Sequence, residues 1–414
     1  MNSRFFAPAL LTLVAAAALV ACGGGGSSGG TATTAAATTS GTTSGTGSGT
    51  APVPAVDTVT TNSATIAAAI GAATIAGASS DEEVYNLAAD VGDSWQLVLN
   101  NKTNTYVVKV LVSQFNLSTT TAAPFTKTTA GTITTVKDAS GSALSVQIDT
   151  RTKTAAGNVK VGTKTSTVSG SGYTIADVGK LAGNYFFAGS VRNTLNGQFR
   201  DTPLGGFIIA ANGTDITVCD GSIAVNGACV AVSSSSPPIK SKALKVSKDA
   251  AGLLRIMDGT KDFGILHVGA GDRGPILVLD RFGLSDDTPS VLRTGVFYGA
   301  KSAKLAGTEF DGNWTCSNGG ADLATLVVSG TSYTVNARNT ASQGTLQYNK
   351  VYVGASKSVS DLNGALIAQN NAESLSDASL VLPLSNSLAI VVNSPSAPST
   401  QLGTDKNINV CRKV

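Results

Sequence analysis

The stretch Trp95–Ser113, WQLVLNNKTNTYVVKVLVS, decides the fold class of this chain. Two runs rich in β-branched, aliphatic and aromatic residues, 95–100 and 105–113, flank the Asn-rich segment 101–104. Runs of this kind are typical of strands, and Asn-rich segments are typical of tight turns. The stretch therefore predicts an antiparallel hairpin.

Strand-like segments continue downstream of this hairpin, separated by turns rich in Gly, Ala and Ser. They are Thr129–Val136, Ala143–Asp149, Asn158–Val161 and Thr165–Ser169. After residue 90 no long segment has the 3.6-residue period of an amphipathic helix. We predict an all-β fold of two or three antiparallel sandwich or barrel-like modules, with the first module a small sandwich.

A weak internal repeat indicates how the modules are divided. Gly179-Lys-Leu-Ala-Gly183 recurs as Ala303-Lys-Leu-Ala-Gly307, and each copy leads into an aromatic segment. The spacing is far longer than the 20 to 50 residues of a solenoid repeat, so it favours domain duplication. We predict a short helical or linker segment over 64–92, followed by an N-terminal β module (93–178), a middle β module (179–300) and a C-terminal β module (301–414).

The second copy of the repeat is followed by Gly312-Asn313-Trp314. This tripeptide resembles the Gly-x-Trp signature near the first strand of lipocalin-like (calycin) barrels. The resemblance implies closed or partly closed antiparallel barrels.

The N-terminus has the three-part layout of a secretory signal, with Arg4, an apolar run from Phe5 to Val20, and small residues before Cys22. A membrane-spanning helix needs about 20 apolar residues, more than this run provides. Leu19-Val20-Ala21-Cys22 resembles the lipobox of bacterial lipoproteins. The resemblance implies a signal peptide over 1–21 and a mature protein that begins at a lipidated Cys22.

In that family the cysteine sulfur carries diacylglycerol and its nitrogen an acyl chain, here expected to be palmitate, so the membrane is a partner through the lipid anchor. Gly23 stands where an aspartate favours retention in the inner membrane, which implies the outer membrane. The alternative is a soluble secreted protein with a chance cysteine at its cleavage site.

Residues 22–63 are mostly Gly, Ser, Thr and Ala. This composition cannot bury enough apolar surface to offset its ordering entropy, and it predicts a flexible tether with a reach of about 35 to 40 Å. The Gly25–Gly29 match to a G-x-S-x-G elbow is rejected, because that elbow requires a strand and a helix around its serine.

The whole chain of 414 residues has 29 basic and 26 acidic side chains, a formal net charge of +3. This balance gives no reason to expect a nucleic-acid partner.

Four cysteines remain once Cys22 is lipidated, and export would oxidise them. Of the three pairings that four cysteines allow, we predict Cys219–Cys229 within one hairpin and Cys316–Cys411 between the first and last strands of the C-terminal module. A zinc site is the alternative, but the chain has no close C-x-x-C pair. We therefore expect no metal.

Gly269–Gly274 matches G-x-G-x-x-G, the dinucleotide-binding pattern, which requires a helix after its last glycine. The strand-like Pro275–Asp280 follows instead, so the glycines predict a hairpin turn and no cofactor. The only histidine, His267, lies on the preceding strand-like segment without a serine elbow, as expected of a structural side chain.

Acidic residues gather in four places: Asp81-Glu82-Glu83, Asp286-Asp287, Asp258–Asp262 and Asp361–Gly364. Adjacent carboxylates on an extended chain point to opposite faces. We interpret the first two groups as solvated loops and the last two as turns that join strands, and we assign no catalytic residue.

Aromatic residues cluster at Tyr185-Phe186-Phe187 and at Phe297-Tyr298. On a strand, half of each cluster points to the core and half away from it. We expect a non-enzymatic envelope lipoprotein that binds a protein, a glycan or a small apolar ligand through its β modules. The alternative is a lipid-anchored extracytoplasmic hydrolase with His267 and a carboxylate as its acid and base.

Overall fold

The structure is a computed structural model. It describes residues 58–193, 200–201, 203–220, 224–229, 241–283, 292–318, 321–337, 340–353, 358–371, 378–392 and 408–414. The predicted signal peptide, Cys22 and all of the tether up to residue 57 lie outside the described residues. Residues 55–414 form one compact unit.

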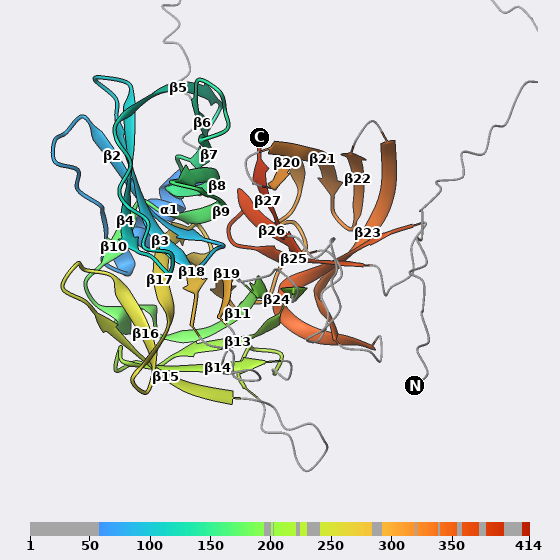
Figure 1. The fold of residues 1–414 in the computed structure, drawn as a ribbon. Coiled ribbons are helices and arrows are strands. Elements are labelled where there is room, and N and C mark those ends of the chain that lie inside the picture. The colour runs from blue at the N-terminus through green and yellow to red at the C-terminus, as the bar shows by residue number, and fades with distance from the viewer. Residues whose placement is uncertain are drawn as a thin grey trace, which may run out of the picture. The chain divides into compact units, whose positions relative to one another are not determined.

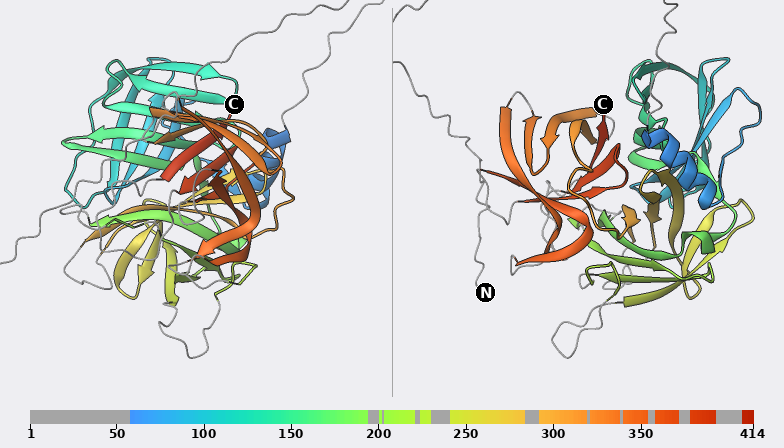
Figure 2. Two further views of the ribbon diagram at one scale, coloured as in Figure 1. Left: turned by 90° about the vertical axis from the view of Figure 1, so that its right-hand side faces the viewer. Right: turned by 180° about the vertical axis from the view of Figure 1, so that it is seen from behind.

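Helix α1 (Thr58–Ala69) includes the last six residues of the predicted tether, 58–63, which corrects that boundary. Val59, Ser63 and Ala67 are spaced by four residues and form its buried face. This face, poor in large apolar groups, gave too weak a signal to distinguish the helix from the tether. Helix α1 lies beside β17 (Lys261–Gly271) and β18 (Gly274–Arg281), which belong to the second barrel (Figure 2).

The first barrel is a closed ring of eight antiparallel strands in chain order (Figure 1). They are β2 (Glu82–Ala89), β3 (Asp93–Asn100), β4 (Thr105–Val112), β5 (Ala123–Ala130), β6 (Ile133–Asp138), β7 (Leu144–Asp149), β8 (Thr154–Val161) and β9 (Lys164–Ser171). The predicted hairpin over 95–113 is confirmed as β3 and β4.

Three expectations about this module are corrected. The module begins at Glu82 and not at residue 93, because β2 pairs with both β3 and β9 and completes the ring. The ring is a barrel and not a sandwich. The predicted strand 129–136 is two strands, because Gly131, at φ +60°, makes the turn between β5 and β6.

The second barrel closes through the pairing of β11 with β19. Its strands are β11 (Gly183–Asn193), β13 (Leu204–Ile209), β14 (Asp215–Asp220), β15 (Ser241–Lys248), β16 (Leu254–Asp258), β17 (Lys261–Gly271), β18 (Gly274–Arg281) and β19 (Arg293–Lys301). The short β12 (Arg200–Asp201) pairs with the far end of β11 in the same register as β13, along the same edge of β11.

The third barrel is likewise a closed ring of eight antiparallel strands in chain order. They are β20 (Gly312–Asn318), β21 (Ala321–Ser329), β22 (Ser332–Ala337), β23 (Thr340–Val353), β24 (Ser358–Asn370), β25 (Ser379–Pro383), β26 (Leu388–Val392) and β27 (Ile408–Lys413). Residues 361–364, predicted as a turn, lie inside β24; Gly364 there adopts φ +90°. The all-β, multi-module fold predicted from the sequence is thus confirmed, with three modules.

Small elements connect the barrels. Strand β1 (Ala72–Thr74) pairs with β10 (Tyr173–Ile175), and the 3-10 helix η1 (Val178–Leu181) leads into β11. The repeated Lys-Leu-Ala-Gly precedes the first strand of the second and of the third barrel. Its glycines, Gly183 and Gly307, have φ of +142° and +101°, which only glycine adopts readily.

Each barrel interior is filled by one face of its strands, as the size of an eight-stranded ring requires. The first holds Trp95 and its aliphatic neighbours, the second Tyr185 and Phe187, and the third Trp314 and Tyr333. The indole of Trp314 donates to the carbonyl of Phe310 at 2.7 Å.

The outer faces of β11, β18 and β19 are also buried. Ile276, Val278 and Tyr298 on these strands form one apolar cluster with Leu382 and Ile390 of the third barrel. A fully buried aliphatic side chain contributes about 1.5 to 3 kcal/mol, so this shared cluster holds the second and third barrels together.

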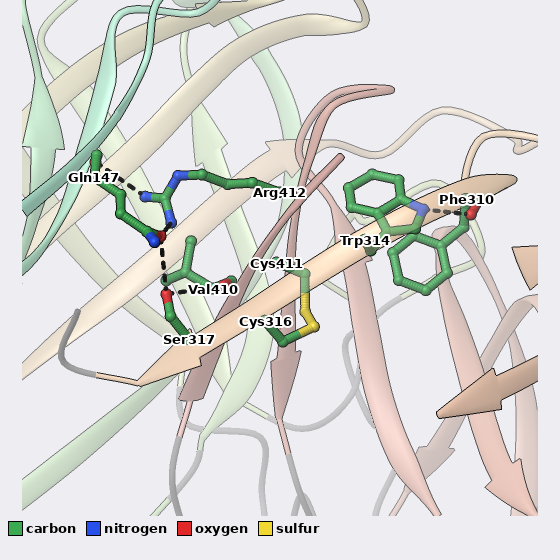
Figure 3. Close-up of a disulfide and its surroundings, with 8 residues drawn as sticks. All are labelled: Gln147, Phe310, Trp314, Cys316, Ser317, Val410, Cys411 and Arg412. Atoms are coloured by element: carbon green, nitrogen blue, oxygen red, sulfur yellow. Dashed lines mark hydrogen bonds between the residues drawn. A yellow bond between two sulfur atoms is a disulfide. The ribbon is translucent and has the colours of Figure 1, made fainter. Parts of the chain in front are cut away.

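Both predicted disulfides are present, Cys219–Cys229 and Cys316–Cys411. Cys316 and Cys411 face each other in the β20–β27 pairing, where the third barrel closes. Figure 3 shows the alternation of this strand pair: the disulfide lies on one side with Trp314, and Arg412 reaches the other way toward Gln147. No helix in the described part of the chain is long and apolar enough to cross a membrane.

Candidate functional site

A pocket with a cavity volume of about 70 Å³ lies where the three barrels meet, and we call it the junction pocket. The first barrel lines it through the turn after β2 and through β8 and β9, the second through β11 and β19, and the third through β20 and β27. Its lining residues are Asp90, Ala156, Gly157, Thr167, Val168, Ser169, Ser190, Val296, Tyr298, Ser317, Asn318, Ile408 and Val410.

The β2–β3 turn fixes Asp90 at the pocket. The amide of Asp90 donates to Thr167 O at 2.9 Å, and its carbonyl accepts from Thr294 Oγ1 at 2.9 Å. Gly92 closes the turn at φ +87°, where a Cβ would come within 2.3 Å of Thr294 Cγ2. This turn therefore requires glycine, both for its backbone conformation and for its close contact with the second barrel.

The Asp90 carboxylate contacts side chains of two different barrels. Arg192 of β11 places Nη2 3.0 Å from Oδ1, and Ser166 of β9 donates its hydroxyl to the same oxygen at 2.5 Å. Arg192 Nε is buried and has no hydrogen-bond partner in the described residues. The Asp90 side chain is 26% exposed and that of Arg192 is 29% exposed, so the pair lies where solvent reaches the site.

Tyr298 contributes a buried phenol from the second barrel. Its hydroxyl and that of Ser169 on β9 form a short hydrogen bond across the junction. Burial raises the pKa of Tyr298 to about 12 and outweighs the opposite effects of Ser169 and of nearby Arg412. The phenol is therefore protonated at neutral pH and remains both a donor and an acceptor.

The third barrel supplies Ser317, Asn318 and two aliphatic side chains. Behind Ser317, Arg412 Nη1 donates to Gln147 Oε1 of the first barrel at 3.1 Å (Figure 3). Deeper in this contact, Asp149 is fully buried and accepts two guanidinium hydrogen bonds from Arg151, at 2.9 and 3.1 Å. Ser387 Oγ of the third barrel donates to Asp149 Oδ2 at 3.1 Å, and Arg151 Nη2 donates to the carbonyl of Lys413 at 3.0 Å. These hydrogen bonds to charged groups hold the third wall of the pocket against the first barrel.

Five hydroxyls, one amide and one ion-paired carboxylate thus line the junction pocket, together with aliphatic side chains. Hydroxyl and amide groups both donate and accept hydrogen bonds. This lining is suited to holding a small polar group by hydrogen bonds.

His267, the candidate acid or base, does not line the pocket. It lies on the outer face of β17, opposite the interior-facing Leu266 and Val268, and is 4% exposed. Burial lowers the pKa of His267 to about 4, so the imidazole is neutral at pH 7, and its Nε2 has no hydrogen-bond partner in the described residues.

A buried carboxyl that the sequence did not single out, Asp280, lies on the neighbouring strand β18. Ser94 Oγ of the first barrel donates to Asp280 Oδ2 at 2.5 Å. Burial raises the pKa of Asp280 well above its ordinary value, and the nearby carboxylates of Asp93 and Asp90 raise it further. Asp280 is fully buried, so it acts as a contact between barrels and does not reach solvent.

The glycines at 269–274 form the end of β17, a tight turn and the start of β18, as predicted. The turn docks on the third barrel: Asp272 Oδ1 accepts from the amide of Asn386 at 2.9 Å, and Arg273 forms an ion pair with Glu309 at 3.0 Å. The motif is therefore a structural contact.

The acidic groups serve as local structural contacts where the structure describes them. Glu83 pairs with Lys127 at 2.7 Å, and Asp258 with Lys242 at 2.6 Å. Asp361 pairs with Lys350 at 2.5 Å across β23 and β24. Asp286 and Asp287 lie outside the described residues. Within the described ranges, no group of three or more His, Cys, Asp and Glu side chains is arranged to hold a metal ion.

The aromatic clusters alternate as predicted. Tyr185, Phe187 and Phe297 point into the second barrel, whereas Phe186 and Tyr298 point outward. The outward side chains are covered by the other barrels, and Tyr298 reaches the pocket. The remaining pocket residues could not be predicted from the sequence, because serines, threonines and a turn aspartate have no distinguishing local pattern.

No protein-family model matches the chain, and no curated protein matches it.

Proposed function

We propose that this protein is a lipid-anchored lipoprotein of the outer membrane whose tethered β-barrels bind a ligand without catalysing a reaction. The anchor rests on Leu19-Val20-Ala21-Cys22, which resembles a lipobox. Several acyl chains at about 0.8 kcal/mol per buried methylene would hold the protein firmly on its membrane.

The observation that supports a binding role is the junction pocket. Its lining offers hydrogen-bonding groups from three barrels, while its carboxylate is paired with Arg192 and its phenol stays protonated. Such groups hold and orient a ligand. Proton transfer would need a group that titrates near neutral pH, and the raised pKa of the Tyr298 phenol does not suit that task.

The hydrolase alternative has no observation in its favour, because His267 is buried away from the pocket. Replacing His267 by Gln tests it: ligand binding should be unchanged. Hydrolysis of p-nitrophenyl acetate that the wild type catalyses and the folded variant does not would support the alternative.

Metabolic labelling with a palmitate analogue tests the anchor. The wild type should be labelled and sediment with the outer membrane, and Cys22→Ser should be neither labelled nor membrane-bound. Gly23→Asp is a matched control, which should keep the label but move to the inner membrane. An unlabelled wild type or a labelled serine variant would refute the anchor.

A further inference from the structure

We propose that the junction pocket binds the edge of a neutral sugar ring, the terminal hydroxylated unit of a glycan. This inference rests on the proposed binding function and specifies its ligand class. It is carried by the size, the lining and the charge of the pocket.

The size limits how much of a ligand can enter. The cavity of about 70 Å³ is a few times larger than what one water needs and far smaller than the roughly 300 to 1,000 Å³ of a pocket for a drug-sized ligand. It therefore accommodates a hydroxymethyl group or a pair of ring hydroxyls. The rest of the ligand would extend past the partly exposed Asp90 and Arg192.

The lining distinguishes a hydroxylated group from an apolar one. Tyr298, Ser169 and Ser317 are almost fully buried, so their hydroxyls have little water to bond. An apolar ligand group in the pocket would displace the remaining water and would not replace the hydrogen bonds that this water makes to the lining. Each lining group left unsatisfied would cost about 1 to 3 kcal/mol of binding free energy. Ligand hydroxyls donate and accept, and they match this lining.

Among the described residues, large side chains of the strands themselves fill the interiors of the first and third barrels, where an apolar ligand would otherwise bind. The first interior contains the fully buried Trp95 and Leu97, and the third contains Trp314 and Phe310.

The charge distribution favours a neutral ligand. The Asp90 carboxylate lies in the pocket wall and repels anions. The guanidinium of Arg192, 3.0 Å away, offsets this negative charge and so weakens the attraction of the carboxylate for cations. A carboxylate also accepts strong, charge-assisted hydrogen bonds from sugar hydroxyls. We therefore assign Asp90, Tyr298 and Ser169 as the main contacts of the sugar.

Saturation-transfer NMR and titration calorimetry on the full-length protein in mild detergent test this assignment. The probes are methyl α-D-glucopyranoside and N-acetylglucosamine, with acetate as the anionic comparison and 1-hexanol as the apolar one. We expect at least one sugar to bind. Tyr298→Phe should weaken it about 3- to 10-fold and Asp90→Asn about 10-fold or more, as expected for losing a neutral and a charge-assisted hydrogen bond.

Tyr185→Phe is the matched control, since it removes another buried phenolic hydroxyl, which donates to Leu181 O at 2.5 Å and does not line the pocket. It should leave sugar binding unchanged, and melting curves show whether each variant is folded. Binding of acetate or hexanol in place of sugar would overturn the ligand class but not the binding role. Sugar binding that survives both pocket substitutions would show that the sugar does not bind in the junction pocket. If none of the probes binds, both the ligand class and the pocket as a binding site are overturned. Labelling at Cys22 is decided independently of all these outcomes.

Discussion

Removal of the Cys316–Cys411 disulfide should cost more stability than removal of Cys219–Cys229. The first bond links residues 95 apart in the sequence and the second links residues 10 apart. In the chain-entropy model, a cross-link over about 95 residues stabilises by about 4.7 kcal/mol at 25 °C, against about 2.7 kcal/mol for a loop of about 10. The two effects should therefore differ by about 2 kcal/mol.

The position of the long-range bond adds to its effect. Both sulfurs are buried, and the bond crosses the β20–β27 seam, which holds the last strand of the third barrel beside the first. Without it, only non-covalent contacts hold the final strand beside β20.

The assay is urea unfolding of the full-length protein under oxidising conditions. It compares the double variant Cys316→Ala/Cys411→Ala with the matched pair Cys219→Ala/Cys229→Ala. Peptide mapping without reductant should first find both cross-links in the wild type. An equal or larger loss in the short-loop variant, or free thiols at residues 316 and 411, would refute the reasoning.

Three further outcomes follow from buried groups and one turn. Burial lowers the pKa of His267 to about 4, against 6.5 for the exposed side chain, so as the pH falls the unfolded chain binds a proton at His267 before the folded protein does. The free energy of unfolding should therefore fall by about 3 kcal/mol as the pH drops from 6.5 to 4. Urea titrations of His267→Gln should lack this loss. For Asp280, whose pKa is raised, stability should change with pH in the opposite direction: the stability that this carboxyl contributes is present at low pH and lost as the pH rises through the raised pKa. Asp280→Asn should therefore gain stability relative to wild type between pH 5 and pH 8. A difference in stability that does not change over this range would contradict the burial of Asp280 as a carboxyl. Gly92→Ala should destabilise by about 1 to 3 kcal/mol more than Gly131→Ala in thermal melts, because both glycines have positive φ but only Gly92 has a neighbour, Thr294, in the place of the new Cβ.

Local sequence signals were sufficient to predict the structure wherever the contacts that determine it are between neighbours in the chain. The alternation and turn chemistry of 95–113 predict a hairpin, and the strand-like 275–280 after the glycines at 269–274 predicts a turn without a nucleotide site. Both features depend on short-range geometry, which the period of two along a strand and the preferences of turn residues express directly. The Cys316–Cys411 bond joins residues 95 apart, and it was predicted from the positions of the two cysteines in the first and last strands expected of the C-terminal module.

The sequence by itself therefore determined an all-β chain of several modules, two disulfides and an N-terminal motif that resembles a lipobox. Only the tertiary structure decided that each module is a closed barrel, that β2 belongs to the first ring, and that the outer faces of β18 and β19 are buried against the third barrel. It also brought Asp90, Ser169, Tyr298 and Ser317 to one pocket. The physical reason is that these residues belong to three barrels and become neighbours only when the barrels dock, and side-chain packing across long sequence separations leaves no periodic signal in the chain.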